Sequence, residues 1–315
     1  MVMSTLRVGI AVATVVMVVG CTSDQPEDAT PTTSPSPSPA ESSTPAPRPE
    51  FEVDRVLADI RYLAREVGPR HGTSDAYAEA ADWVEERFTE LGYDVVRQEV
   101  DVPAGTSWGI RVPAGRTPNV IASPPEFDDE AEHRIVGAHL DTVPQAPGAE
   151  DNASGIAVML ELARVHAQGE HPVRFIAFTS EEPRGPGDNL HHFGSRAYVN
   201  RLDGPERDAM RAMVSLDRVG ARGRAVPLCT GGLGTDRVRG RLSSLADDAD
   251  VPTTLCDGNR ASDHWSFERN ELPSARVGSI PYAAYHSARD LPRVVDQRQL
   301  KRVGTIMSAW LQRAG

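Results

Sequence analysis

The sequence predicts an α/β domain built on a mixed, largely parallel β-sheet that helices cover on both faces. Apolar runs bounded by turn signals alternate with stretches of helical periodicity after residue 50, the pattern of strand and helix units. Three of these runs end at or near His, Glu or Asp, at 134–139, 174–182 and 212–217. Open α/β sheets place ligands beyond the carboxyl ends of their strands. The fold class therefore predicts a polar site at these three strand ends.

The helices are predicted from the spacing of apolar residues. In 53–63 and 80–91 the apolar side chains recur every three or four positions, and Gly92 is a helix-stopping residue. Further helices are expected at 155–167, 236–246 and 300–313. Strands are expected at 95–102 and 119–122 besides the three apolar runs. Strands that alternate with helices predict a sheet covered on both faces.

The first 20 residues have the pattern of a secretory signal. Arg7 precedes the apolar stretch 8–20, which is shorter than the ~20 residues that a membrane-spanning helix needs. Val18-Val19-Gly20-Cys21 resembles the lipobox of bacterial lipoproteins, in which the cysteine becomes the acylated first residue. The alternative is an ordinary secretory signal that contains a cysteine. We expect a lipoprotein signal peptide at 1–20, and a protein held at the outer face of the bacterial cell membrane by a lipid on Cys21.

A polar tether follows the signal. Residues 21–50 are mostly Pro, Ser, Thr and acidic residues, so they have too little apolar surface to offset the entropy of ordering. We expect this segment to be a disordered tether and 51–315 to be a single catalytic domain, which is long enough for a sizeable core.

Charge and cysteine content limit the partners. The formal net charge is −12 and Lys301 is the only lysine, so no basic patch indicates nucleic acid and an acidic surface would repel it. We expect a monomer. Besides Cys21 the chain has Cys229 and Cys256. In an exported protein we expect these two to form a disulfide, with two buried free thiols as the alternative.

Two of the strand-end groups fit a metal site. Asp141 follows His139 by two residues and could hold one imidazole nitrogen while the other nitrogen binds a metal. The alternative is a surface His beside an incidental Asp. Asp151 opens a predicted helix at 151–155, where it is either an N-cap or a carboxylate kept charged by the helix N-terminus.

The other candidates come from later strand ends. Glu181 and Glu182 are adjacent, so behind a buried strand their side chains diverge, and one can bind a metal while the other serves as a general base. Asp217 ends the next apolar run, and His286 lies in Tyr-His-Ser-Ala-Arg-Asp at 285–290. Solvated charge, a turn residue and a partly buried loop His are the respective alternatives. Five groups in this order, namely His139 with Asp141, Asp151, the Glu pair, Asp217 and His286, favour a metal site over five separate coincidences.

The ordered motifs resemble the co-catalytic di-zinc aminopeptidases, of the aminopeptidase Y and bacterial leucyl aminopeptidase type. The motifs are G-A-H-L-D, D-N-A-S-G, E-E, S-L-D-x-V-G, S-D-H and Y-H-S-x-x-D, and the similarity runs from Gly68 to the C-terminus. The resemblance implies a zinc aminopeptidase that acts on peptides with a free N-terminus, with two Zn²⁺ per chain.

The resemblance also implies residue roles. His139 and Asp217 would hold one zinc, Glu182 and His286 the other, and Asp151 would bridge them. Glu181 would be the general base, and Asp141 would orient the first His. Tyr285 matches a tyrosine that steadies the tetrahedral intermediate in some members. The Ser-Asp-His motif at 262–264 would support the site without binding metal.

One segment departs from the family pattern. Relatives follow the Glu pair quickly with Gly-Leu-x-Gly-Ser, whereas 183–193 separates the pair from Gly194-Ser195 here. We expect this longer loop to line the substrate cleft, with His191 and His192 as rim or surface residues.

Two other functions remain open. A glutaminyl cyclase on the same scaffold needs one zinc and releases ammonia from N-terminal Gln. A binding protein on this fold has generally lost ligands or the general base, and in this sequence every one of those residues is present.

Overall fold

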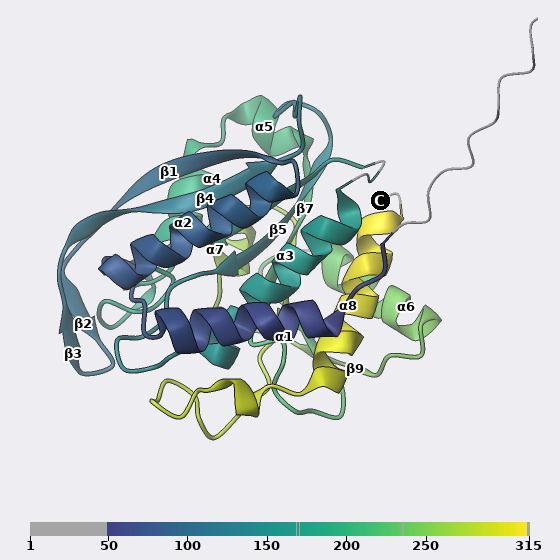
Figure 1. Cartoon of the computed structure of the whole chain (residues 1–315). Helices are drawn as coiled ribbons and strands as arrows, with labels where there is room; N and C mark the ends of the chain where they lie inside the picture. Colours follow the sequence, from purple (N-terminus) through teal and green to yellow (C-terminus); the bar gives the residue numbers. More distant parts are fainter. Residues whose placement is uncertain (1–48, 168, 170, 235, 314–315) are drawn as a thin grey trace, which may run out of the picture. The chain divides into compact units, whose positions relative to one another are not determined.

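In the computed structural model, eight strands form one sheet in the order β1-β4-β6-β5-β7-β10-β8-β9 (Figure 1). The strands are β1 (Asp94–Val102), β4 (Gly115–Ser123), β5 (His133–His139), β6 (Val173–Phe178), β7 (Met210–Asp217), β8 (Val226–Cys229), β9 (Thr253–Cys256) and β10 (Ser274–Gly278). The four central strands β6, β5, β7 and β10 are parallel, whereas β1, β4 and β8 run antiparallel to their inner neighbours. The predicted mixed, largely parallel sheet is confirmed.

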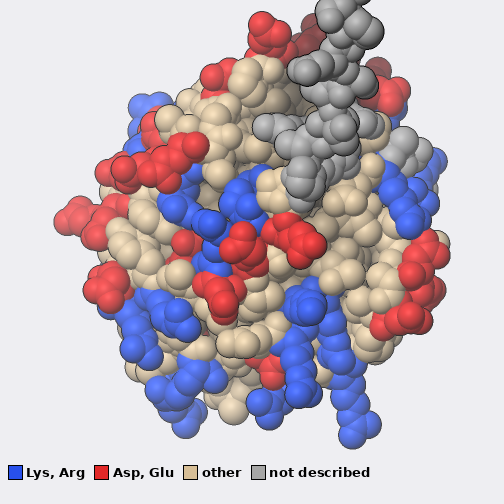
Figure 2. Space-filling model, turned by 45° about the vertical axis from the view of Figure 1, so that its right-hand side comes forward, with Lys and Arg blue, Asp and Glu red and all other residues tan. Residues whose placement is uncertain are grey.

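The structure describes residues 49–167, 169, 171–234 and 236–313. The predicted signal peptide, Cys21 and all of the predicted tether except residues 49 and 50 lie outside these ranges. None of the helices in the described ranges combines the length and apolar character that crossing a bilayer requires. On the face that Figure 2 shows, basic and acidic side chains are interspersed.

Helices cover both faces of the sheet. On one face, an extended apolar core joins the sheet to α1 (Val53–Arg61), α2 (Asp75–Glu90), α3 (Ser154–His166), α6 (Arg237–Asp248) and α8 (Gln297–Gln312). On the other face, a smaller core joins it to α4 (Phe193–Arg201) and α7 (His264–Glu268). The α5 helix (Gly204–Ala209) leads into β7. Short helical turns are η1 (Tyr62–Val67), η2 (Ala149–Ala153), η3 (Asp188–Leu190) and η4 (Pro292–Val294).

Alternating side chains of the central strands supply both cores. Val136 of β5 and Val214 of β7 belong to the larger core, whereas their neighbours Ile135 and Met213 belong to the smaller one. All four are fully buried. Successive residues of a strand point to opposite faces, so a run that is apolar at every position indicates a strand covered on both sides.

A capping side chain begins α2, and a glycine follows its end. The Ser74 hydroxyl accepts the backbone N–H of Tyr77 at the start of α2, and Gly92, just after the end of α2, has φ 85°. That left-handed conformation favours glycine. The expected helices at 155–167, 236–246 and 300–313 correspond to α3, α6 and α8 within a few residues.

Three strands of the sheet and a small hairpin were not predicted. The β8 and β9 strands have four residues each, β10 has five, and β2 (Gly105–Ser107) and β3 (Ile110–Val112) have three. Arg276 also interrupts the apolar character of β10. Such short or interrupted runs give no clear periodicity.

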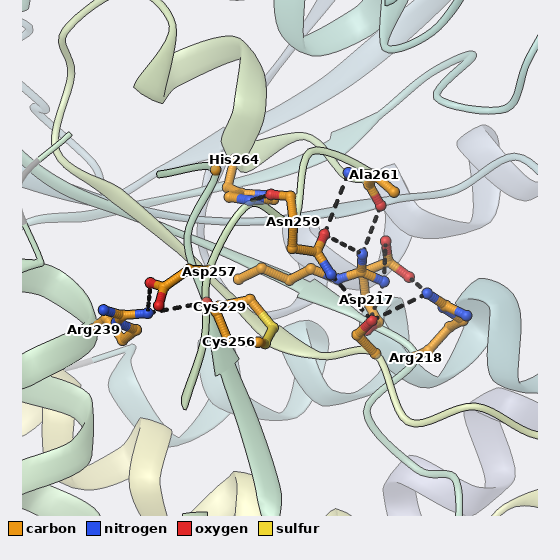
Figure 3. Close-up of a disulfide and its surroundings, with 12 residues drawn as sticks. Asp217, Arg218, Cys229, Arg239, Cys256, Asp257, Asn259, Ala261 and His264 are labelled. Carbon is orange, nitrogen blue, oxygen red and sulfur yellow. Dashed lines mark hydrogen bonds and ion pairs between the residues drawn. A yellow bond between two sulfur atoms is a disulfide. The ribbon is translucent and has the colours of Figure 1, made fainter. Parts of the chain in front are cut away.

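The disulfide between Cys229 and Cys256 is confirmed. The two residues face each other at the ends of the parallel pair β8 and β9, with Cα atoms 4.5 Å apart (Figure 3). The sequence separation is 27 residues. Because β9 makes its ladder only with β8, the bridge fixes the outermost strand at this edge of the sheet.

Removing the bridge should lower the free energy of unfolding. For a closed loop of this length, the chain-entropy model gives about 3.5 kcal/mol. Urea unfolding should therefore show a loss of about that size in a Cys229→Ala/Cys256→Ala variant. Thiol titration of the unfolded, unreduced wild type provides the control, since reactive thiols at both positions would contradict the bridge.

Candidate metal centre

The candidate residues meet at one edge of the sheet. His139 is the last residue of β5, Asp217 is the last of β7, and Glu181 and Glu182 follow β6. These strands are parallel neighbours, so their carboxyl ends lie together. Asp151 reaches the same edge from η2, and His286 reaches it from the loop after β10. All six side chains are buried.

Asp151 belongs to two groups of possible metal ligands. One group is His139, Asp151 and Asp217, and the other is Asp151, Glu182 and His286; the ligand atoms in each group lie within 4.8 Å of one another. Asp151 Oδ1 lies 3.3 Å from His139 Nε2, and Asp151 Oδ2 lies 3.0 Å from His286 Nε2. Each carboxylate oxygen of Asp151 is therefore directed to a different group.

The donor atoms of both groups suit zinc. Glu182 Oε1 lies 3.2 Å from His286 Nε2, and Asp217 Oδ1 lies 3.7 Å from His139 Nε2. Both oxygens are buried, and neither has a hydrogen-bond partner among the described residues. Buried polar atoms are normally satisfied, so these two oxygens are suited to contact a cation. Imidazole nitrogen and carboxylate oxygen are common zinc ligands.

Burial and neighbouring charges shift the pKa values of Glu182 and Asp151 in opposite directions. Burial raises the pKa of Glu182 to about 8, with Asp151 and Glu181 adding to the rise against the opposing effect of His286. Burial would also raise the pKa of Asp151, but His139 and His286 together hold it well below its ordinary value. Cations would relieve this repulsion, because nearby positive charge favours ionised carboxylates.

Asp141 holds the backbone that carries the two glutamates. Its Oδ1 accepts the N–H of Glu181 at 3.0 Å, and its Oδ2 accepts the N–H of Glu182 at 3.1 Å. His139 Nδ1 lies 3.6 Å from Asp141 Oδ1 and 3.1 Å from the Asp141 carbonyl oxygen. The expected contact to His139 is therefore made more closely by the Asp141 main chain than by its carboxylate.

Asp290 holds the backbone of the turn that carries Asp151. Its carboxylate oxygens accept the N–H groups of Glu150 and Asp151 at 3.0 and 3.1 Å. The Tyr282 hydroxyl donates to Asp290 Oδ2 at 2.9 Å. Asp151 has non-helical dihedral angles and the N-cap of α3 is Ala153, so Asp151 is not an N-cap. The role of Asp290 was not predicted, although this residue ends the Y-H-S-x-x-D motif.

The expectation that His192 is a rim or surface residue is wrong. Its side chain is buried, and its Nε2 lies 3.1 Å from Glu181 Oε1. The loop 183–193 turns back on itself, because His192 N–H donates to the carbonyl of Glu181 at 3.0 Å. Burial would lower the pKa of His192, but the Glu181 carboxylate raises it above its ordinary value. The loop has no hydrophobic periodicity, so its sequence does not predict that His192 contacts Glu181.

The Ser-Asp-His motif is buried beside the site. Ser262 Oγ lies 2.9 Å from Ser215 Oγ, and His264 Nε2 lies 2.8 Å from the Asn259 carbonyl oxygen. Burial and the Glu181 charge raise the pKa of Asp263 to about 7. Neither of the two possible metal groups includes a residue of this motif.

Tyr285 is at the exposed margin of the site. It is 39% exposed, so it can reach a bound molecule, and its ring stacks on His286 with centroids 3.6 Å apart. The Arg218 guanidinium carbon lies 4.5 Å from the centre of the Tyr285 ring. Trp108, at the tip of the β2–β3 hairpin, packs edge-on against His286 with centroids 4.4 Å apart. Neither Trp108 nor Arg218 was predicted from the sequence to be near the site.

Comparison with known families identifies a match over most of the described chain. The model of peptidase family M28 matches residues 119–311. This range contains every candidate metal ligand and extends from β4 to α8.

Curated relatives match in part. An uncharacterized protein of Escherichia coli, YfbL, is 30% identical over 51% of this chain and 48% of its own length. Aminopeptidase YwaD of Bacillus subtilis is 30% identical over 55% of this chain and 39% of its own length. The probable lipoprotein aminopeptidase LpqL of Mycobacterium tuberculosis is 40% identical over 27% of this chain and 16% of its own length. Each match thus spans less than half of the relative.

Solved structures share the fold. BSAP, a zinc aminopeptidase from Bacillus subtilis, has a TM-score of 0.72 at 19% identity, covering 82% of this chain and 94% of its own. A glutaminyl cyclase of Bacteroides thetaiotaomicron has a TM-score of 0.71 at 20% identity, covering 85% of this chain and 100% of its own. These similarities show that the chain shares the fold of the two proteins.

Asp151→Ala should remove more bound metal than either His139→Ala or His286→Ala. The Asp151 carboxylate faces both ligand groups, whereas each histidine belongs to one group. Elemental analysis of the three purified variants after dialysis measures the metal content per chain. Equal metal loss in all three would show that Asp151 is not shared between two ions.

Proposed function

The chain belongs to peptidase family M28, and on that premise we propose that it is a di-zinc aminopeptidase that removes N-terminal residues from peptides. The observation that carries the proposal is the sharing of Asp151 between two groups of metal ligands. In this proposal His139 and Asp217 would hold one zinc, Glu182 and His286 would hold the other, and Asp151 would contribute to both. When bound, the two ions would lower the pKa of a shared water and polarise the scissile carbonyl.

Glu181 is the proposed general base. It is buried at the same edge of the sheet as the ligands but belongs to neither ligand group. Its carboxylate would accept a proton from the attacking water and return it to the leaving amine. Two contacts hold it in place, because Asp141 fixes its N–H and His192 lies 3.1 Å from its Oε1. Burial would raise the pKa of Glu181, but His139 and His192 lower it below its ordinary value.

Tyr285 is proposed to steady the tetrahedral intermediate. Its exposed position beside His286 supports this role, since a group that contacts the reacting carbonyl must be open to the substrate. The loop 183–193 is proposed to line the substrate cleft, and the contact of His192 with Glu181 at 3.1 Å supports this proposal.

A glutaminyl cyclase is the second candidate. One observation favours it: Asp217 forms an ion pair with the buried Arg276 at 3.0 Å, so one of the two ligand groups is partly neutralised without a metal. A cyclase needs one zinc, and release of ammonia from a peptide with N-terminal Gln would identify it. Hydrolysis of aminoacyl-p-nitroanilides would identify the aminopeptidase.

The two adjacent glutamates provide the sharpest test of the aminopeptidase. Glu181→Ala should keep near-normal zinc content and fold, and its turnover should fall by a factor of about 10²–10⁴, the contribution of a positioned acid or base. Glu182→Ala should instead lose zinc, with activity partly restored by excess zinc. Turnover of aminoacyl-p-nitroanilides and elemental analysis measure the two effects.

Glu271→Ala is a matched control, because Glu271 is an exposed acid outside the two ligand groups. It should change neither zinc content nor turnover. If Glu181→Ala and Glu182→Ala both behave like this control, the proposed assignment of the pair is wrong.

We also propose that the mature protein starts at Cys21 and is held at the outer face of the cell membrane by lipid on that residue. The lipobox-like sequence 18–21 supports this proposal, as does the partial likeness to the probable lipoprotein aminopeptidase LpqL. Such an anchor would tether the peptidase domain through 21–50.

Cys21→Ser should give a soluble or unprocessed precursor whose peptidase domain remains active. The neighbouring Thr22→Ala keeps the cysteine and should remain in the membrane fraction. Fractionation followed by mass spectrometry of the N-terminal peptide makes the measurement. A wild-type protein without an acyl group on Cys21 would exclude the anchor.

A further inference from the structure

Four arginines line one cavity of about 630 Å³ that contains none of the candidate metal ligands. The cavity lies between the loop that precedes β8 and the start of α8. Its lining residues are Arg222, Gly223, Arg224, Asp296, Arg298 and Arg302, so four cations face one carboxylate. The formal net charge of the whole chain is −12. This cavity is therefore a local concentration of positive charge on an acidic protein.

The two segments that form the cavity are joined to each other. Ala221 and Val295 form an isolated antiparallel β-bridge directly beside it. Across the cavity, Arg302 Nη1 of α8 donates to the Gly223 carbonyl oxygen of the loop at 3.0 Å. The backbone that carries the arginines is therefore held in place by contacts within the protein, and a ligand does not have to assemble it.

Two of the four guanidinium groups lack a partner within the described part of the chain. Arg222 Nε lies 3.1 Å from Asp296 Oδ2, and Arg302 donates to the loop as described above. The side chains of Arg224 and Arg298 form no ion pair or hydrogen bond with any described residue, and both residues are exposed. Arg298 and Arg302 are also four positions apart on α8, where like charges repel. An anion in the cavity would pair with the two unpartnered groups and relieve this repulsion.

We propose that this arginine-lined cavity binds a phosphate group, carried either by a soluble phosphate ester or by a phospholipid headgroup. The planar donor fork of a guanidinium matches the oxygens of phosphate. A phosphate monoester carries a charge of about −1.5 to −2 at pH 7, so it offsets more of the excess positive charge than a single carboxylate does. This second site is separate from the metal centre, and it depends neither on zinc nor on peptidase activity.

Titration calorimetry of the full-length protein in a neutral detergent tests the site, at low ionic strength, where exposed charges are screened least. The probes are inorganic phosphate, glycerol 3-phosphate and glycerophosphoglycerol, which is the headgroup of an anionic lipid without its acyl chains. Saturable binding of one molecule per chain is expected. Tighter binding of glycerol 3-phosphate assigns the site to soluble esters, and tighter binding of glycerophosphoglycerol assigns it to lipid headgroups. Glycerophosphocholine, which has no net charge, should bind more weakly than either.

Substitutions in the lining should change the affinity in both directions. Arg224→Gln and Arg298→Gln should each weaken binding by about tenfold, the loss expected for one charge-assisted hydrogen bond. Asp296→Asn should instead tighten binding, because it removes the only carboxylate of the lining while asparagine can still cap α8. Damage to the fold would not produce such a gain. Arg269→Gln is the matched control, since Arg269 is an exposed arginine outside this cavity, and it should bind like the wild type.

Three outcomes would overturn the inference. The first is a wild-type protein that binds none of the phosphate probes in a saturable way. The second is an unchanged affinity when Arg224→Gln and Arg298→Gln are combined, or an Asp296→Asn variant that binds no more tightly than the wild type. The third is an equal loss of affinity in Arg269→Gln, because binding would then be a general property of exposed arginines.

Discussion

The concentration of buried carboxylates at one edge of the sheet is the constraint on which the rest of the structure depends. Asp151, Glu181, Glu182 and Asp217 are all less than 10% exposed, so water screens little of their mutual repulsion. Unpaired buried charge is costly. The imidazoles of His139, His192 and His286 and the guanidinium of Arg276 offset part of this charge. Glu182 Oε1 and Asp217 Oδ1, which accept no hydrogen bond from the described residues, are the carboxylate oxygens best suited to contact a cation.

Holding these carboxylates together requires a rigid backbone, and buried side chains provide it. Asp141 and Asp290 each accept two consecutive N–H groups, one pair at Glu181 and Glu182 and the other at Glu150 and Asp151. Arg70 is fully buried and donates to the carbonyl oxygens of Leu140 and Pro147, which lie on either side of the loop that connects β5 to η2. Ligands on a fixed backbone need little reorganisation when a metal binds.

Site residues at the ends of strands could be predicted from local sequence pattern. Site residues that reach the site through the fold of a long loop could not. His139 and Asp217 were predictable, because each ends a largely apolar run that is typical of a strand buried on both faces. His192 was not, because the loop 183–193 has no periodicity and its contact with Glu181 depends on a turn in three dimensions. Arg276 was missed for a different reason, since a charged residue in a five-residue strand resembles a loop in sequence.

The disulfide has a consequence for how the sheet meets other molecules. A sheet edge offers unpaired backbone groups to which a strand of a second protein can add. At one edge, β9 has four residues and its end is covalently tied to β8, so it cannot detach and leave the partner strand open. At the other edge, Arg97 of β1 pairs with Asp82 and Glu85 of α2. A short tied strand and a charged strand are two ways to discourage intermolecular β-pairing, and this sheet has one at each edge.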